Sequence, residues 1–207
     1  MTQNLQYIIQ EARKAVLLSF NSGWATKLKY HDYQHTVQVV DDALILAEKC
    51  HLSPTEKFII EISALFHDMG YSDSYDEHEK ISSEMAAVFL QQHQLPDAII
   101  EQVTLCICST RVPQTPKDIV SQLLCDADLA YLGKSGFISN LDKLRVEWKE
   151  LLRINGNQID FYQNTLSFCE KHRYFTACAR EEFDVVKSQN ITELKKLIQS
   201  LLNNLHF

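Results

Sequence analysis

The chain has 207 residues, a formal net charge of −7 and 45% hydrophobic residues, which is the composition of a globular protein of one domain. No apolar run approaches the roughly 18–20 residues of a membrane-spanning helix, and no basic stripe with interleaved aromatic residues indicates a nucleic-acid polymer as partner. The N-terminus lacks the apolar stretch of a signal peptide, and the six cysteines form no CxxC pair, so we expect a cytoplasmic protein with reduced thiols.

Apolar residues recur with a period close to 3.6 almost throughout the chain, which predicts an all-α fold. Only five glycines and four prolines are present, which favours long helices with short connections. We therefore expect a bundle of about eight to ten helices. In chain order they are predicted at residues 5–17, 37–47, 57–68, 79–93, 97–109, 118–131, 138–153, 157–187 (with an interruption near His172) and 191–205.

Local signals mark several ends of these helices. The segment Ser53–Glu56 combines a serine cap, a proline at the first helical position and a glutamate three residues after the cap. Gly70 is placed to end the helix that follows. The segments 71–79 and 110–117 are predicted loops, and 133–136 is a further break. No linker separates domains, so we expect one domain over 1–207, with a motif-bearing core at about 25–135 and additional C-terminal helices at about 138–207.

Three segments that carry histidine, aspartate or both indicate a metal site. Residues 30–35 read YHDYQH, the doublet His67-Asp68 ends a strongly apolar helix, and residues 124–129 read LCDADL. A carboxylate in the interior is unfavourable unless it is paired or bound to a metal. Both Asp68 and the pair Asp126 and Asp128 lie in apolar helical patterns. Carboxylates that two apolar helices carry into the interior predict a shared cation.

The chemistry of these ligands suits a divalent ion. Two imidazoles and two carboxylates from separate helices can converge in the core of a bundle. Mixed nitrogen and oxygen ligands favour Mn, Fe, Ni, Zn or Mg over a soft-metal thiolate site. Two carboxylates balance the charge of the ion, and four protein ligands leave positions for water and a substrate oxygen.

The order of these motifs resembles the HD superfamily of metal-dependent phosphohydrolases over roughly residues 30–133. The opening motif of Tyr30, His31 and His35 also looks like that of cyclic-nucleotide phosphodiesterases and small bacterial HD hydrolases. The resemblance implies an all-α HD-domain bundle in which the metal ligands are His35, His67, Asp68 and an aspartate of the 126–128 turn. An "Ala-Asp-Leu"-like turn favours Asp128, while Asp126 stays open as the alternative register.

The sequence departs from the two-metal members of that superfamily. Those members add histidines after the doublet, and His78 is a candidate match for the first of them. No histidine stands near residues 109–111, where the later one falls. We therefore expect one tightly bound divalent metal ion per chain, and a second ion only weakly bound if at all.

Further residues are candidates for catalysis or substrate contact. The resemblance to phosphodiesterases makes His31 a candidate acid for the leaving oxygen, with a surface or capping role as the alternative. Asp32 and Asp73 are candidates for orienting water or a histidine ring, and His78 for catalysis or second-metal contact. Arginine is a natural bidentate partner of phosphate, which makes Arg111 a candidate for substrate contact. The basic cluster of His172 and Arg173 is a weaker candidate, because an exposed helix face would look the same.

The sequence thus predicts a metal-dependent phosphohydrolase, in which metal-activated water attacks a phosphomonoester or phosphodiester of a nucleotide or related small molecule. The main alternative is a regulatory HD module that binds a nucleotide or metal without turnover. A mixed-metal oxygenase of the same broad fold and a purely structural helical protein are further alternatives. The expected partner is a small phosphorylated substrate, not a nucleic-acid polymer or a membrane. The substrate, the metal and the oligomeric state, including a homo-oligomer, are left open.

Overall fold

The computed structural model describes residues 2–151 and 156–204, all of them in helices or their connections, with no strand among them. The all-α prediction is therefore confirmed. The chain divides into two compact units, Met1–Asp128 and Leu129–Phe207. Whether it forms the single domain expected from the sequence stays a prediction. None of the described helices has both the length and the apolar character needed to cross a membrane.

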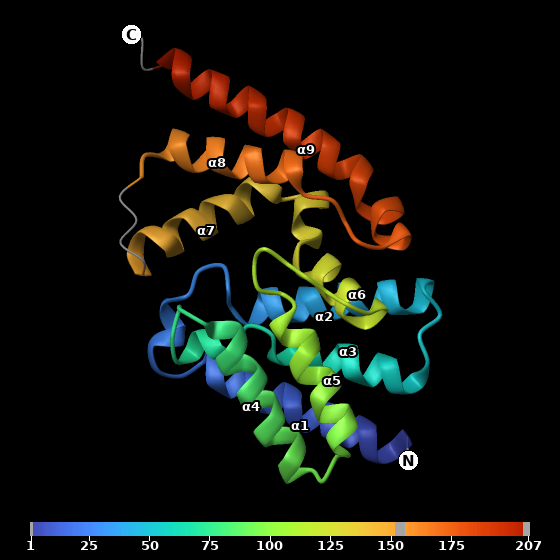
Figure 1. The fold of residues 1–207 in the computed structure, drawn as a ribbon. Helices are drawn as coiled ribbons and strands as arrows, with labels where there is room; N and C mark the ends of the chain where they lie inside the picture. The colour runs from blue at the N-terminus through green and yellow to red at the C-terminus, as the bar shows by residue number, and fades with distance from the viewer. Residues whose placement is uncertain (1, 152–155, 205–207) are drawn as a thin grey trace. The chain divides into compact units, whose positions relative to one another are not determined.

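The first unit is built around one buried helix. Its elements are α1 (Thr2–Phe20), the 3-10 helix η1 (Gly23–Lys27), α2 (Tyr33–Lys49), α3 (Pro54–Phe66), the 3-10 helix η2 (Met69–Ser72), α4 (His78–Gln92), α5 (Asp97–Cys108) and α6 (Ile119–Asp128). Helix α3 contacts α1, α2, α4, α5 and α6. Helices α4 and α5 form an antiparallel pair (Figure 1). The apolar residues that predicted α3 are those buried in this core, including Phe58, Ile62 and Leu65.

Helix α3 begins where the sequence predicts. The Ser53 hydroxyl accepts a hydrogen bond from the Glu56 amide at 3.3 Å, and the Glu56 carboxylate accepts one from the Ser53 amide at 2.8 Å. Pro54 occupies the first turn, where its missing N–H would have had no helical partner. This capping box fixes the start of the helix whose other end carries His67 and Asp68.

Gly70 allows η2 to lie directly against the first turn of α4. A Cβ at this position would collide with the backbone carbonyl of His78, and it would lie 2.9 Å from the Ser82 amide nitrogen. The Gly70 amide donates to the Ser82 hydroxyl at 2.8 Å. This close approach brings His78 beside the segment that carries the histidine–aspartate doublet.

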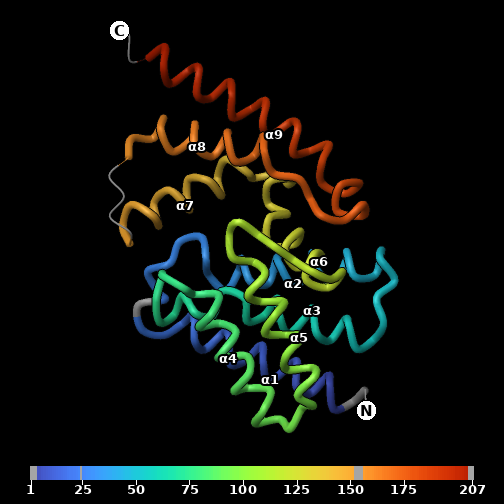
Figure 2. The backbone as a smooth tube through the Cα atoms, viewed as in Figure 1, coloured from blue at the N-terminus to red at the C-terminus, as the bar shows by residue number. Residues whose placement is uncertain are grey.

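The second unit contains η3 (Ala130–Gly133), α7 (Phe137–Leu151), α8 (Gln158–Lys171) and α9 (Ala177–Asn204). Figure 2 shows α8 running alongside α9, which it contacts. The core is a cluster of buried side chains: Leu132, Phe137, Leu141, Tyr162, Cys169, Leu194 and Ile198. Asn190 fastens α9 to η3, because its side-chain amide donates to the carbonyls of Leu132 and Lys134 at 2.9 Å each.

The helices of the structure differ from the predicted ones at two boundaries and agree with them at a third. The predicted 118–131 helix is shorter in the structure: α6 stops at Asp128, and a 3-10 turn follows. The interruption near His172 is confirmed, since α8 ends at Lys171 and α9 begins at Ala177. The predicted break between 187 and 191 is wrong: α9 runs through it, because Lys187 and Asn190 are buried and hydrogen-bonded. Positions 152–153 and 205 of the predicted helices lie outside the described residues.

Candidate metal centre

The four predicted metal ligands come from three places in the first unit. His35 lies in the first turn of α2, His67 and Asp68 connect α3 to η2, and Asp128 is the last residue of α6. Helix α2 contacts both α3 and α6, so their ends converge. The first turn of α2 is fixed by Asp32, whose carboxylate accepts the His35 amide hydrogen at 2.9 Å.

The ligand atoms of these residues face one another. His35 Nε2 lies 3.4 Å from Asp68 Oδ2 and 3.6 Å from Asp128 Oδ1. His67 Nε2 lies 3.1 Å from Asp68 Oδ2 and 3.6 Å from Asp128 Oδ1. Metal–ligand bonds of about 2.1 Å place adjacent ligand atoms about 3.0–3.5 Å apart. The observed spacings therefore fit ligands arranged around one ion.

Three of these atoms are buried and lack a hydrogen-bond partner, namely His35 Nε2, His67 Nε2 and Asp68 Oδ2. The tautomer of His67 follows from its other nitrogen, since Nδ1 lies 2.8 Å from the Ala64 carbonyl oxygen and must donate to it. In the neutral imidazole, which is the form that binds a metal, His67 Nε2 therefore presents a lone pair to the group. A cation is the partner that satisfies imidazole lone pairs and a carboxylate oxygen together.

The electrostatics of the group favour positive charge. Burial lowers the pKa of His35, but its contacts with Asp128 and Asp68 outweigh burial and raise the pKa to about 9. Burial raises the pKa of Asp128, yet His35 and His67 bring it down to about 2. The pKa of Asp68 is held well below its ordinary value against burial, chiefly by His67 and His35. Two ionised carboxylates in a buried site match the charge of a divalent ion.

Comparison with known proteins agrees with this geometry. The family model described as "HD domain" matches residues 32–130, a range that contains all four ligand candidates. Residues 32–130 are thus similar to an HD domain. HD domains bind divalent metals, and His35, His67 and Asp128 offer ligand atoms within 4.8 Å of one another. No curated protein sequence matches the chain.

Three solved structures share the fold over nearly the whole chain. A predicted HD superfamily hydrolase from an uncultured Thermotogales bacterium is 19% identical, covers 99% of this chain and 92% of its own, and has a TM-score of 0.55. The Lin1889 protein of Listeria innocua is 17% identical, covers 98% and 97%, and has a TM-score of 0.61. Bacillus subtilis YpgQ, solved in complex with ADP, is 18% identical, covers 95% and 96%, and has a TM-score of 0.67.

The first unit also places a residue beside Asp128 that the sequence does not predict. The Gln114 side chain, in the connection between α5 and α6, donates to Asp128 Oδ2 at 3.4 Å. The other carboxylate oxygen, Oδ1, is the one that faces His35 and His67. Gln114 therefore orients the carboxylate. No local sequence signal identifies it, because the contact depends on how the connecting loop folds back.

Imidazole and phenol rings line one side of the ligand group. His78 Nε2 lies 3.7 Å from Asp68 Oδ1 and 3.5 Å from Glu79 Oε1. The ring of Tyr71 stacks on His78 at a centroid distance of 3.7 Å and lies 4.4 Å from the ring of His31. His31 and His78, predicted from separate motifs, are therefore brought to one place. Tyr71 and Glu79 were not predicted, although both are close in sequence to the doublet or to His78.

The other predicted residues of the first unit lie outside this ligand group. Asp126 is fully buried in α6, two residues from Asp128, and is not among the grouped ligand atoms. Asp32 serves as the cap of α2, and Asp73 is exposed at the end of η2. Arg111 is exposed in the connection between α5 and α6. Their predicted functional roles stay predictions.

His172 and Arg173 belong to the second unit, where both are tied into local hydrogen bonds. His172 Nδ1 accepts from Lys187 Nζ at 2.9 Å, and Arg173 donates to the carbonyls of Glu170 and His172. Burial, helped by the charges of Lys187 and Arg173, lowers the pKa of His172 to about 4. The imidazole is therefore neutral near pH 7. Substrate contact by this pair stays a prediction.

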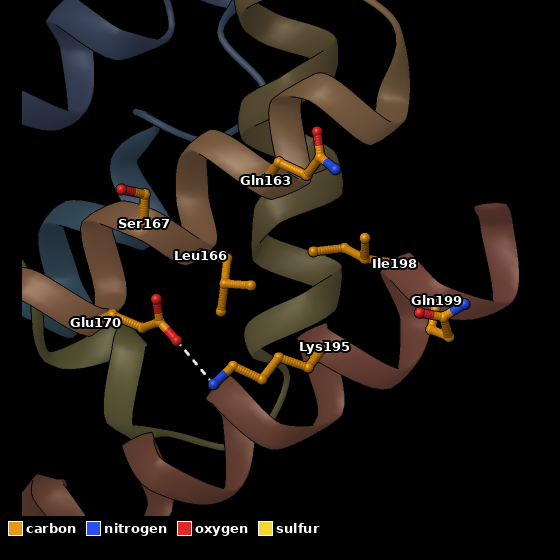
Figure 3. Close-up of a pocket in the computed structure, with 7 residues that line it drawn as sticks. All are labelled: Gln163, Leu166, Ser167, Glu170, Lys195, Ile198 and Gln199. Atoms are coloured by element: carbon orange, nitrogen blue, oxygen red, sulfur yellow. Dashed lines mark ion pairs between the residues drawn. The ribbon is translucent and has the colours of Figure 1, made fainter.

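A surface groove of about 340 Å³ lies in the second unit between α8 and α9 (Figure 3). Glu170 and Lys195 form an ion pair of 2.7 Å across it, beside the apolar side chains of Leu166 and Ile198. None of the predicted site residues lines this groove.

Proposed function

We propose that this chain is a metal-dependent phosphohydrolase that cleaves a phosphomonoester or phosphodiester bond in a nucleotide or related small molecule. The observation that carries the proposal is the set of buried ligand atoms without partners, His35 Nε2, His67 Nε2 and Asp68 Oδ2, which face Asp128 Oδ1 in an HD domain. Such a set is unfavourable unless a cation occupies it.

In this proposal His35, His67, Asp68 and Asp128 hold the ion. A bound divalent cation lowers the pKa of its water and polarises a phosphoryl oxygen. The Ala64 carbonyl keeps the imidazole of His67 in the ligating tautomer. Asp68 and Asp128 balance the charge of the ion, so that a phosphate group can approach without meeting an excess of negative charge.

His31 is the proposed donor of a proton to the leaving oxygen. Its ring lies 5.8 Å from the ring of His35, so it is adjacent to the ligand group without belonging to it. A donor at such a position can reach the oxygen of a scissile bond whose phosphoryl group is bound at the ion. His78, beside Asp68 and Glu79, is the second proposed catalytic residue on the side of the site where His31 lies.

A nucleotide is the proposed substrate class because YpgQ, which shares the fold over 95% of this chain, was solved in complex with ADP. The identity of 18% makes this a starting point for a substrate screen rather than an assignment of one nucleotide.

The test combines metal analysis with an activity screen. The purified chain is expected to contain a divalent metal and, with added Mn²⁺, to release phosphate or nucleoside monophosphate from one or more nucleotides. His67→Asn and Asp68→Asn are expected to lose the metal and to lower kcat/KM at least about 100-fold, or about 2.7 kcal/mol of transition-state stabilisation. His51→Asn is the matched control, because His51 is exposed and asparagine tolerates its positive φ of 56°.

Two results would reject the enzymatic proposal. One is a folded wild-type chain that binds no divalent metal. The other is saturable binding of ADP with no product after hours in the presence of metal, which would identify a non-catalytic regulatory HD module instead.

A further inference from the structure

Tyr71 lies at the centre of the aromatic cluster beside the ligand group. Its side chain is buried, with a relative exposure of 5%. Its ring centroid is 3.7 Å from that of His78 at an interplanar angle of 15°, and 4.4 Å from that of His31 at 31°. The ring of Tyr75 lies 4.7 Å away at 54°. Tyr71 is thus in contact with both histidines that flank the ligand group.

The two imidazoles lie on opposite faces of the phenol ring. The His78 ring is close to parallel with it, the His31 ring is tilted by 31°, and both centroids are within 4.4 Å of its own. Two rings placed so on one face would overlap, because neighbouring rings in a plane need more than about 5 Å between centroids. The order of rings is therefore His31, Tyr71, His78.

This arrangement joins residues from different elements. His31 precedes α2, Tyr71 belongs to η2, and His78 begins α4. His78 is held from other sides as well, since its Nδ1 lies 3.3 Å from the Tyr75 carbonyl and its Nε2 lies near Asp68 and Glu79. The Tyr71 ring stacks on His78, whose orientation these contacts fix. His31 lies on the other face of the Tyr71 ring, which therefore constrains the plane of the His31 imidazole.

We propose that Tyr71 is a positioning residue, whose ring sets the plane of the His31 imidazole so that it delivers a proton to the leaving oxygen of the substrate. The proposal rests on the proposed phosphohydrolase function. The aromatic face performs this role and the hydroxyl does not, because the stacking surface is the ring. In this proposal Tyr71 acts through His31 and not by contact with the substrate.

The kinetic test compares Tyr71→Leu, which removes the ring, with Tyr71→Phe, which keeps it. Two substrates are used with each variant, an alkyl phosphate ester and the corresponding p-nitrophenyl ester, whose leaving group needs no proton. For Tyr71→Leu we expect kcat on the alkyl ester to fall about 10- to 100-fold with KM little changed, since misplaced catalytic groups reduce rates by such factors. The p-nitrophenyl ester should lose less than about threefold, and Tyr71→Phe should match the wild type on both.

A second readout does not depend on activity. Stacking on a phenol shifts the imidazole C–H proton resonances of His31 and His78 upfield, and His31→Gln and His78→Gln variants assign them among the eight histidines. The shifts should persist in Tyr71→Phe and disappear in Tyr71→Leu, while metal content stays that of the wild type.

The proposal is overturned if Tyr71→Leu slows both esters equally, if Tyr71→Phe loses as much as Tyr71→Leu, or if the wild-type resonances show no upfield shift. A wild-type chain that hydrolyses no phosphate ester rejects the proposed function instead. The upfield shifts of the His31 and His78 resonances would then still show whether the Tyr71 ring stacks on both imidazoles.

Discussion

Asp128 divides its two carboxylate oxygens between different partners. Oδ1 faces the imidazoles of His35 and His67 at 3.6 Å, and Oδ2 accepts a hydrogen bond from the Gln114 side chain at 3.4 Å. This division leaves Oδ1 for a metal ion while the amide holds the plane of the carboxylate. Residues that orient a ligand in this way contribute to metal affinity without touching the metal.

We predict that Gln114→Ala weakens metal binding. The bond to Asp128 is long, which places the effect near the lower end of the range for such partners, at about a tenfold rise in the Kd for Mn²⁺. Isothermal titration calorimetry of the metal-free protein measures it. Gln102→Ala, at an exposed position of α5, is the control and should bind as the wild type does. An unchanged Kd for Gln114→Ala would show that the amide does not orient the ligand.

Sequence reasoning identifies His67, Asp68 and the aspartates of α6 because they place ionisable groups in apolar helical patterns, whereas His35 is implied only by the resemblance to the HD superfamily. The apolar pattern alone leaves Asp126 and Asp128 open, since both interrupt it in α6, and only the resemblance to an "Ala-Asp-Leu"-like turn favours Asp128. Residues two apart on a helix differ by about 200° around its axis, so only one of them can face His35 and His67. The packing of α6 on α2 selects Asp128, and that packing is not encoded by any local signal. Tyr71 and Gln114 were missed for the same reason.

At the scale of elements, the contact between η2 and α4 determines where His78 lies. This contact requires glycine at position 70, because any Cβ there meets the backbone of His78 and Ser82 rather than a side chain that could move aside. The sequence predicts Gly70 as a helix end, but its second role, the close approach of α4, becomes visible only in three dimensions.

We predict that Gly70→Ala destabilises the protein by about 2–3 kcal/mol, the range expected when extra volume is forced against backbone. Urea unfolding followed by circular dichroism measures the free energy of unfolding. Gly156→Ala is the matched control, because a Cβ at Gly156 meets nothing within 4 Å. If Gly70→Ala and the wild type had equal free energies of unfolding, η2 and α4 would be able to move apart without loss of stability.

The helix boundaries show where periodicity succeeds and where it fails. The capping box of α3 and the break before α9 were predicted, because Ser53, Pro54 and Glu56 act locally and His172 interrupts the apolar pattern. The expected break near 187–191 was wrong, since buried polar residues look like loop residues in a sequence. Lys187 donates to the His172 carbonyl at 2.7 Å, so its burial is compensated by a partner 15 residues away.

At the scale of the whole molecule, the two compact units recur together in other proteins. The three solved structures match 92% to 97% of their own length to this chain, which includes both units. The all-α class was predictable because the helical period extends along the chain. The number of cooperative units was not, because it depends on the contact free energy between helices and not on their pattern. We propose that the chain unfolds as the single domain expected from its sequence.

Metal binding provides a test of this proposal. An ion that binds only the folded state at 100 times its Kd stabilises that state by about 2.7 kcal/mol. For a chain of this size we expect Tm to rise by about 5–10 °C when Mn²⁺ is added to the metal-free protein. When EDTA removes the ion, Tm should return to the value of the metal-free protein. Differential scanning calorimetry should show one transition that moves as a whole, because the ligands lie in one unit and a single domain shares their stabilisation.

The same scan of His67→Asn is the control, since a chain that has lost a ligand should show little shift with Mn²⁺. Two transitions, of which Mn²⁺ moves only one, would instead show that the unit containing His35, His67, Asp68 and Asp128 unfolds separately from the residues after Asp128. The boundary would then divide the chain at the end of α6, immediately after the last of the four candidate ligands.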